Sequence, residues 1–314
     1  MAGFIAKRLL LTLPTLLLVA ASVFVLVRLI PGDPVLVLLG DQASEAQLAD
    51  ARAALGLDRS FLVQFGLWLS RVLQGDLGRA ITNGQPVLPL ILERFQVSAV
   101  IVLVAVGLAT LVAVPAGLVA AWRQDSALDV AIVAGATLLL SVPSFWLGLL
   151  LLLFFGLKLG WLPVVGFVPF GESASQAALY LVLPIATLVL IEIGTITRMS
   201  RAAAIEVLRL EYVAHARAKG LSERRVLLRH VLPNAFAPTW TLIGLVLGNL
   251  LGGIAVLETV FTLPGLGRLL VDAIFARDYP VVQGCLLFTA LLYVLVNLLV
   301  DLMYPLFDPR VTSE

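Results

Sequence analysis

The sequence predicts an all-α integral membrane protein with six transmembrane helices and both termini in the cytoplasm. Three observations support this fold class: the composition, six long stretches nearly free of charged residues, and an uneven distribution of arginine and lysine. Of the 314 residues, 61% are hydrophobic and 13% are charged, whereas soluble domains carry about 45–50% apolar and about 25% charged residues. The mean hydropathy is +1.05. A lipid bilayer is therefore the expected solvent for most of the chain.

Six stretches are long enough to cross a bilayer, which takes about 20 predominantly apolar residues. They are residues 9–27, 95–122, 130–157, 173–197, 231–257 and 279–300. As helices, all six satisfy their own backbone hydrogen bonds, as segments in lipid must. Pro115, Pro143 and Pro184 fall inside three of these stretches, where packed neighbouring helices tolerate a kink.

The first stretch has an alternative interpretation as a secretory signal peptide. Lys7 and Arg8 precede it, and Val19-Ala20-Ala21 is similar to a cleavage site. However, the apolar run continues to Val27 and exceeds the roughly 7–15 residues of a signal-peptide core. A retained transmembrane helix is therefore favoured.

Arginine and lysine set the expected orientation, because short cytoplasmic segments carry an excess of them. With Lys7 and Arg8 inside, residues 198–229 also fall inside after four crossings, and this segment carries eight arginine and lysine residues. Residues 31–94 are then extracytoplasmic. Within them, the stretch ALGLDRSFLVQFGLWLSRVLQGDLG has helical apolar spacing, which predicts short amphipathic helices at the membrane surface.

The cytoplasmic segment 198–235 predicts a bent pair of helices. The first is expected at about 198–219, continuing the fourth span, and Gly220 is expected to end it. Ser222 can cap the second helix, which is expected to stop near Pro233.

An ordinary positive-inside loop would explain the arginines of this segment but not its alanines. Ala214, Ala216 and Ala218 predict a face that another protein surface can approach closely. We therefore predict a docking element.

This segment resembles the cytoplasmic loop of permease subunits of bacterial binding-protein-dependent ABC importers. The matching residues are Ala216, Gly220, Leu232 and Pro233. The sequence departs from the family pattern at Ala214, where a glutamate is usual, and at His230, where an isoleucine is usual. The stretch YVAHARAKGL, residues 212–221, is similar to the dipeptide, oligopeptide and nickel branch, and in particular to its B-type subunits.

The resemblance extends over the whole chain. Its further phrases are RLIPGDP, LGLDRSFLVQFGLWL, GDLG, SVPSFWLG, GWLPVVG, LETVFTLPGLGRLLVDAIFARDYPVVQG and VNLLVDLMYPLFDPR. Each phrase alone is weak, but together and in this order they are specific. The implied organisation is a first helix with an extracytoplasmic segment, residues 1–95, followed by a permease transmembrane domain of five helices, residues 96–314, that contains the coupling loop 198–235.

The resemblance implies a multi-pass subunit of the bacterial cytoplasmic (inner) membrane that forms a pore, as a heterodimer with a second permease subunit of similar fold. The further implied partners are two cytoplasmic ATPases and an extracytoplasmic solute-binding protein. It also implies a set of ATPase-coupling residues: Glu211, Tyr212, Ala214, His215, Ala216, Arg217, Lys219 and Gly220.

The sequence does not predict an enzyme. It contains no G-x-x-x-x-G-K-[ST] loop, because no glycine is followed by lysine. ATP and Mg are therefore expected on the partner subunits, and no cofactor on this chain. His215 and His230 do not form an H-E-x-x-H pair, and no metal site is predicted.

Two further sets of residues are candidates for function. Glu192 is a charge inside the fourth span, and together with Asn249 it is a candidate for the translocation path, although Asn249 also suits a contact between helices. In the outer loop, Phe261, Pro264 and Gly265 are candidates for contact with the binding protein, or alternatively form a tight turn that shapes the helix ends.

The sequence leaves the cargo open. The predicted function is uptake of di- or oligopeptides, with a nickel chelate or glutathione as alternatives within the same family. Two other classes are less well supported: an ion-coupled secondary transporter with Glu192 as its ion site, for which no internal repeat is visible, and an intramembrane enzyme, for which the spans contain no paired catalytic set. The residues that contact substrate, the role of the outer loops, and whether the second permease subunit is a different chain are also open.

Overall fold

The computed structural model describes residues 2–29, 44–54 and 58–307. Within these residues every regular element is a helix, and the β-type pairing is limited to an isolated bridge between Arg79 and Pro86. The elements are α1 (Ala2–Leu29), α3 (Glu45–Ala54), α4 (Phe61–Leu73), α5 (Val87–Trp122), α6 (Ala127–Ser141), α7 (Ser144–Leu151), η1 (Leu152–Lys158), α8 (Ala174–Leu208), α9 (Glu211–Ala218), α10 (Glu223–Val226), η2 (Leu227–Val231), α11 (Leu232–Gly253), α12 (Ala255–Val260), α13 (Leu266–Phe275) and α14 (Tyr279–Phe307), where η1 and η2 are π-helices.

Five helices in the described part of the chain are long and apolar enough to cross a membrane: most of α1, then α5, α8, the continuous run from α10 to α11, and α14. They correspond to five of the six predicted spans. Helix α5 begins at Val87, earlier than predicted, because a helix that extends beyond the hydrocarbon core can carry charges such as Glu93. The division expected at residue 95 therefore lies inside a helix.

The third predicted span contains Pro143, where a kink was expected to be tolerated, and in the structure it is broken into two parts. The span consists of α6 followed by α7 and η1, and the two parts are bent by 95°. Val142 and Pro143 at the corner are both extended, with ψ angles of 123° and 137°. Proline has no N–H to donate and disfavours helical geometry in the residue before it. The described residues thus contain five candidate spans, or six if the bent pair is counted as one.

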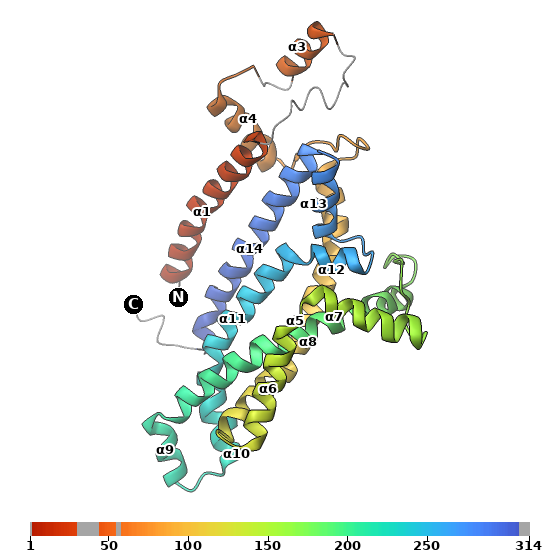
Figure 1. Cartoon of the computed structure of the whole chain (residues 1–314). Helices are drawn as coiled ribbons and strands as arrows, with labels where there is room; N and C mark the ends of the chain where they lie inside the picture. Colours follow the sequence, from red (N-terminus) through yellow and green to blue (C-terminus); the bar gives the residue numbers. More distant parts are fainter. Residues whose placement is uncertain (1, 30–43, 55–57, 308–314) are drawn as a thin grey trace.

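The long helices form a bundle with distinct ends (Figure 1). Helices α5 and α8 pack against each other along much of their length, α6 lies on α8, and α14 lies between α1 and α11. Helices α9 and α10 lie at one end, whereas α4, α12 and α13 lie toward the other. The N-terminal part of α1 and the C-terminal part of α14 point toward the end that carries α9.

The segment after α1 contains α3 and α4, and α4 is amphipathic. The Phe24 ring of α1 packs against Phe61, Phe65 and Trp68 of α4, with ring centroids 5.2–5.3 Å apart. The Arg28 guanidinium lies 3.6 Å from the Phe24 ring centroid. Most other apolar side chains of α4 are exposed, as expected for a helix at a membrane surface.

Candidate functional site

The predicted docking element is centred on α9, a two-turn helix that is separate from α8. Leu210 between them is extended, with a ψ angle of 143°. The prediction of one helix over 198–219 is therefore wrong. The break allows Val207 of α8 and Val213 of α9 to be buried in the same cluster, although residues six apart lie about 120° from each other around a continuous helix.

One face of α9 anchors the helix to the rest of the chain. Val213 and Ala216 are buried against the end of α8 and against Val226, Leu227 and Val231. The Tyr212 hydroxyl donates a hydrogen bond to the carbonyl oxygen of His230 at 3.3 Å. These contacts fix α9 with respect to the start of α11.

The opposite face of α9 is exposed. Seven of the eight predicted coupling residues are exposed, namely Glu211, Tyr212, Ala214, His215, Arg217, Lys219 and Gly220. The eighth, Ala216, is buried. The prediction that Ala214, Ala216 and Ala218 share one face is wrong, because residues two apart point to different sides of a helix. Ala214 and Ala218 are exposed on one side, and Ala216 packs inward.

Gly220 ends α9 as predicted, in a Schellman motif. Its φ angle is +79°, which glycine adopts without steric cost. The Leu221 N–H donates to the Ala216 carbonyl at 3.4 Å, and the Gly220 N–H donates to the Arg217 carbonyl at 2.9 Å. These are the two bonds that define the motif. The Arg217 guanidinium also binds Glu223 across the turn, at 2.9 and 3.2 Å.

The second helix of the insert does not stop near Pro233, contrary to the prediction. It runs through η2 into α11, and residues 223–253 form one continuous helical span. Pro233 is the second residue of α11, which directly follows the π-helical turn η2, so the helix passes this proline without ending. Ser222 precedes α10 without a side-chain cap. The segment after α9 is therefore a helix that continues into the bundle.

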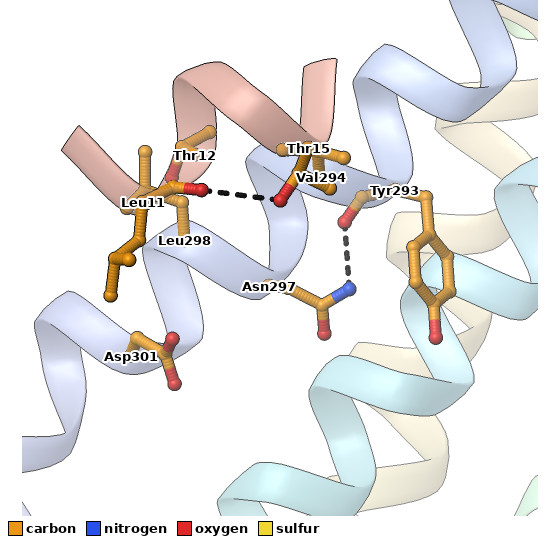
Figure 2. A pocket seen from close by; sticks show the side chains of 8 residues that line it. All are labelled: Leu11, Thr12, Thr15, Tyr293, Val294, Asn297, Leu298 and Asp301. Atoms are coloured by element: carbon orange, nitrogen blue, oxygen red, sulfur yellow. Dashed lines mark hydrogen bonds between the residues drawn. The ribbon is translucent and has the colours of Figure 1, made fainter. Parts of the chain in front are cut away.

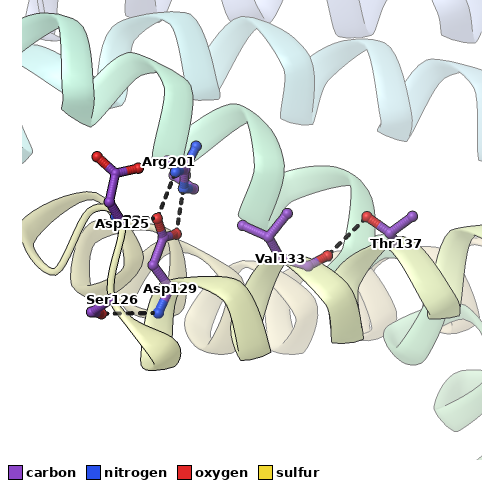
Figure 3. A network of polar contacts seen from close by, with 6 residues as sticks. All are labelled: Asp125, Ser126, Asp129, Val133, Thr137 and Arg201. Atoms are coloured by element: carbon purple, nitrogen blue, oxygen red, sulfur yellow. Dashed lines mark hydrogen bonds and ion pairs between the residues drawn. The ribbon is translucent and has the colours of Figure 1, made fainter.

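An ion pair joins α6 to α8 near the same end of the bundle (Figure 3). The Arg201 guanidinium binds both oxygens of Asp129, at 2.6 and 2.7 Å. The Asp129 side chain is 4% exposed and that of Arg201 is 25% exposed. Asp129 also accepts from the Asp125 N–H at 3.0 Å, and the Ser126 hydroxyl accepts from the Asp129 N–H at 3.3 Å.

Sequence reasoning missed this pair, because the third span was counted from the first residue after Asp129. The available signal was the Ser-x-x-Asp spacing of Ser126 and Asp129, which is typical of a helix N-terminus. Close packing of α5 on α8 reinforces this region: a Cβ atom on Gly117 would lie 2.7 Å from the Thr197 carbonyl oxygen, so no larger residue fits there. The α5–α6–α8 unit is thus held together by polar contacts and close backbone approach.

The two path candidates differ in exposure. Glu192 lies within α8 and is buried. Asn249 lies on α11 and is exposed on the isolated chain. No hydrogen bond joins the side chains of these two described residues.

The outer-loop candidates lie between α12 and α13. Phe261 is buried, and its ring is in contact with Gly148 of α7, where an added Cβ atom would lie 3.1 Å from it. Gly265 is also buried, whereas Pro264 is partly exposed. Two of the three predicted contact residues therefore lie beneath the surface of this chain, and the alternative of a tight turn that shapes the helix ends describes their surroundings.

The surface also contains two grooves. The first, of about 260 Å³, lies between α1 and α14 and includes Thr12, Thr15, Asn297 and Asp301 (Figure 2). Asn297 donates to the carbonyl oxygen of Tyr293 on its own helix at 2.9 Å. The second, of about 470 Å³, lies beside α10 and η2 and includes Arg224, Arg225 and Arg229. In the described residues, no group of three or more histidine, cysteine or carboxylate side chains is placed to hold a metal ion.

Two family models match the sequence. The family described as binding-protein-dependent transport system inner membrane component matches residues 113–313, which is more than half of the chain. The N-terminal family of the membrane components of these transport systems matches residues 1–102. Together the two matches cover nearly the whole chain.

Curated relatives match over their full length. A protein of Brucella abortus whose name describes a peptide transport system permease is 43% identical over 314 residues, which is 100% of both chains. The di/tripeptide transport system permease protein DppB of Pseudomonas aeruginosa is 39% identical, with 100% of both chains covered. The oligopeptide transport system permease protein AppB of Bacillus subtilis is 36% identical, with 99% of both chains covered.

A solved structure shares the fold. It describes inward-facing conformations of the MetNI methionine ABC transporter and matches with a TM-score of 0.57 at 18% identity. The match covers 70% of this chain and 96% of that chain. The similarity at this level of identity concerns the fold alone.

Proposed function

Because the chain belongs to the family of binding-protein-dependent transport system inner membrane components, we propose that it is a pore-forming permease subunit that imports di- or oligopeptides. The observation that carries this proposal is the full-length similarity to peptide permeases from several bacteria. The chain is accordingly a multi-pass protein of the bacterial cytoplasmic (inner) membrane, and its apolar helices suit that environment.

The energy for import comes from partner subunits. We propose that two cytoplasmic ATPases bind ATP and Mg, and that this chain supplies no catalytic group. The absence of a G-x-x-x-x-G-K-[ST] loop from the sequence supports this division of labour. A second permease subunit would complete the pore, and an extracytoplasmic binding protein would deliver the cargo.

We propose that α9 is the coupling helix that seats in the ATPases. Its buried side is fixed by Val213 and Ala216, and its other side is exposed. Closure of the ATPase pair would move α9, and the connections on either side of it lead directly into α8 and α11. This is coupling between two states through a packed, rigid element.

The proposed orientation places both termini and α9 in the cytoplasm, with α4, α12 and α13 outside. The excess of arginine and lysine in residues 198–229 supports it. The arrangement of the helices is compatible with it, since the outer ends of α1 and α14 lie away from α9.

We propose Glu192 and Asn249 as polar residues of the translocation path. Ionisable groups within spanning helices commonly face the interior of the bundle or a water-filled cavity. The Glu192→Gln variant keeps the size and hydrogen bonding of the side chain, so the complex should assemble while uptake falls. Wild-type uptake by this variant would remove Glu192 from the path.

Reconstitution tests the proposed function. The chain, its partner permease and the ATPases are placed in liposomes, and uptake of a labelled dipeptide and a labelled pentapeptide is compared with uptake of a nickel chelate. ATP-dependent peptide uptake stimulated by the loaded binding protein is expected. Uptake that follows an ion gradient without ATP would contradict the proposal, and uptake of the nickel chelate alone would overturn the assignment of the cargo.

A further inference from the structure

Glu258 is a carboxylate without exposed surface, located in α12 at the end of the bundle opposite α9. One of its oxygens accepts a hydrogen bond from the Ser98 hydroxyl of α5 at 2.5 Å. The other accepts from the N–H of Arg268 in α13 at 2.8 Å. Removing a carboxylate from water is costly unless it is well hydrogen-bonded, and here the donors come from two other elements.

The same two side chains satisfy the N-terminus of α13. The Leu266 N–H donates to the Ser98 hydroxyl oxygen at 2.9 Å, while the Arg268 N–H donates to Glu258. The first N–H groups of a helix have no partner within the helix and are usually satisfied by the residue that precedes it. That residue is Gly265, which has no side chain. The negative charge of Glu258 also lies at the positive end of the α13 dipole.

The local sequence leaves room for this arrangement only because residue 265 is glycine. A Cβ atom at this position would overlap the carboxyl group of Glu258. The turn that the sequence predicts from its proline and glycines is therefore closed over a buried carboxylate.

The three joined elements lead to opposite ends of the molecule. Helices α12 and α13 carry the outer surface, including the exposed Phe275. Helix α5 carries Ser98 and packs along α8, which is followed by α9. Glu258 and Ser98 thus bridge the outer segment and the helix pair that reaches the coupling helix.

We propose that Ser98 and Glu258 are a positioning pair that holds α12 and α13 on α5, so that contact of the binding protein with this outer segment is passed to α5 and α8. This inference rests on the proposed function as an importer subunit. The pair does not touch the cargo or ATP, and its effect is on the transmission of the signal.

The test uses Ser98→Ala in the assembled complex in lipid nanodiscs. The variant leaves the Leu266 N–H without its acceptor and removes one donor from Glu258. Amide hydrogen exchange in residues 262–272 should become about tenfold faster, the effect of losing one hydrogen bond. Thr110→Val is the matched control, because Thr110 lies on the same helix and its buried hydroxyl has no partner among the described residues. Amide hydrogen exchange of residues 262–272 in Thr110→Val should equal that of the wild type.

The second readout separates transmission from mere structural support. ATP hydrolysis without the binding protein should be unchanged in Ser98→Ala, while the maximal stimulation by loaded binding protein should fall about fivefold, the lower range of coupling between two sites. The half-saturating concentration of binding protein should stay the same. Glu258→Gln, which retains the size of the side chain, should reduce the stimulation as well.

Unchanged amide exchange of residues 262–272 in Ser98→Ala would overturn the positioning role. Faster exchange with unchanged stimulation of ATP hydrolysis would overturn the proposal that the pair transmits contact of the binding protein to α5 and α8. Failure of the proposed function gives a different result. In that case the wild-type complex itself lacks stimulation by the binding protein, while the exchange of residues 262–272 still reports on the anchor.

Discussion

Gly220 is the residue on which the turn after α9 depends. Its φ angle is +79°, yet a Cβ atom there would meet nothing within 4 Å. Gly220→Val should therefore act through backbone strain alone and destabilise the turn by about 1–2 kcal/mol. We expect normal membrane levels of the chain and reduced co-purification of the ATPases. Gly220→Asn is the matched control, because asparagine tolerates this conformation; equal loss in both variants, or none in Gly220→Val, would contradict the argument.

The ion pair between Asp129 and Arg201 should stabilise the α5–α6–α8 unit. Asp129→Asn keeps the shape but leaves the partly buried Arg201 without its counter-charge. We expect a loss of about 2–3 kcal/mol, between the values for exposed and fully buried pairs, measured by thermal unfolding in detergent.

A double-mutant cycle provides the control for this pair. The Asp129→Leu and Arg201→Met combination should lose less stability than the sum of the single changes, because no charge is left unpaired. Strict additivity would show that the two side chains do not interact energetically.

Some residue roles could be predicted from the sequence and others could not. Gly220 was predictable as a helix terminator because glycine after a basic residue is a common helix end. The Ser-x-x-Asp spacing marks Asp129 locally, but its pairing with Arg201, 72 positions away in sequence, was missed because no local pattern reports such a contact. The burial of Ala216 could have been predicted, since helical spacing separates it from Ala214 and Ala218.

At the scale of elements, α9 depends on its buried face. Val213 has no exposed surface and holds the helix against α10 and η2. Val213→Ala should loosen α9 at a cost of about 1–2 kcal/mol without changing any exposed side chain. The expected result is faster limited proteolysis of residues 209–222 and weaker coupling of ATP hydrolysis to uptake.

Ala214→Ser is the matched control for Val213→Ala, because position 214 lies on the exposed side of the same helix. It should leave the proteolysis pattern unchanged. Equal protease sensitivity of the two variants would mean that the burial of Val213 does not hold α9 in place.

Four of the long helices were predictable as uninterrupted apolar runs, since α5, α8, α11 and α14 lack strong internal breaks. The bend of the third span was not. Pro143 interrupts a helix, whereas Pro115 and Pro184 lie inside α5 and α8 without ending them. The sequence around the three prolines does not distinguish them, because the outcome depends on packing against neighbouring helices. The break between α8 and α9 has no glycine or proline at all.

At the scale of the whole molecule, the order of the long helices followed from hydropathy, while their contacts did not, and their orientation in the membrane stays a prediction from charge. The proposed orientation predicts that a cysteine at Gly171 reacts with an impermeant thiol reagent from outside intact cells. A cysteine at Ser222 should not react. Both positions are exposed, and the native Cys285 is buried, so background labelling should be low. The reverse pattern would overturn the orientation.

The central claim is that α9 carries the contact with the ATPases, and cysteine cross-linking tests it most directly. His215→Cys, on the exposed side of α9, and Gly171→Cys, at the opposite end, are placed singly in the assembled complex and treated with a short cross-linker that joins a thiol to a photoreactive group, so that no thiol is needed on the ATPase. The first variant should cross-link to an ATPase subunit and lose ATP-driven uptake when cross-linked, while the second should form no such product. A complex that transports normally but gives no cross-link at position 215, or an equal one at position 171, would contradict the claim.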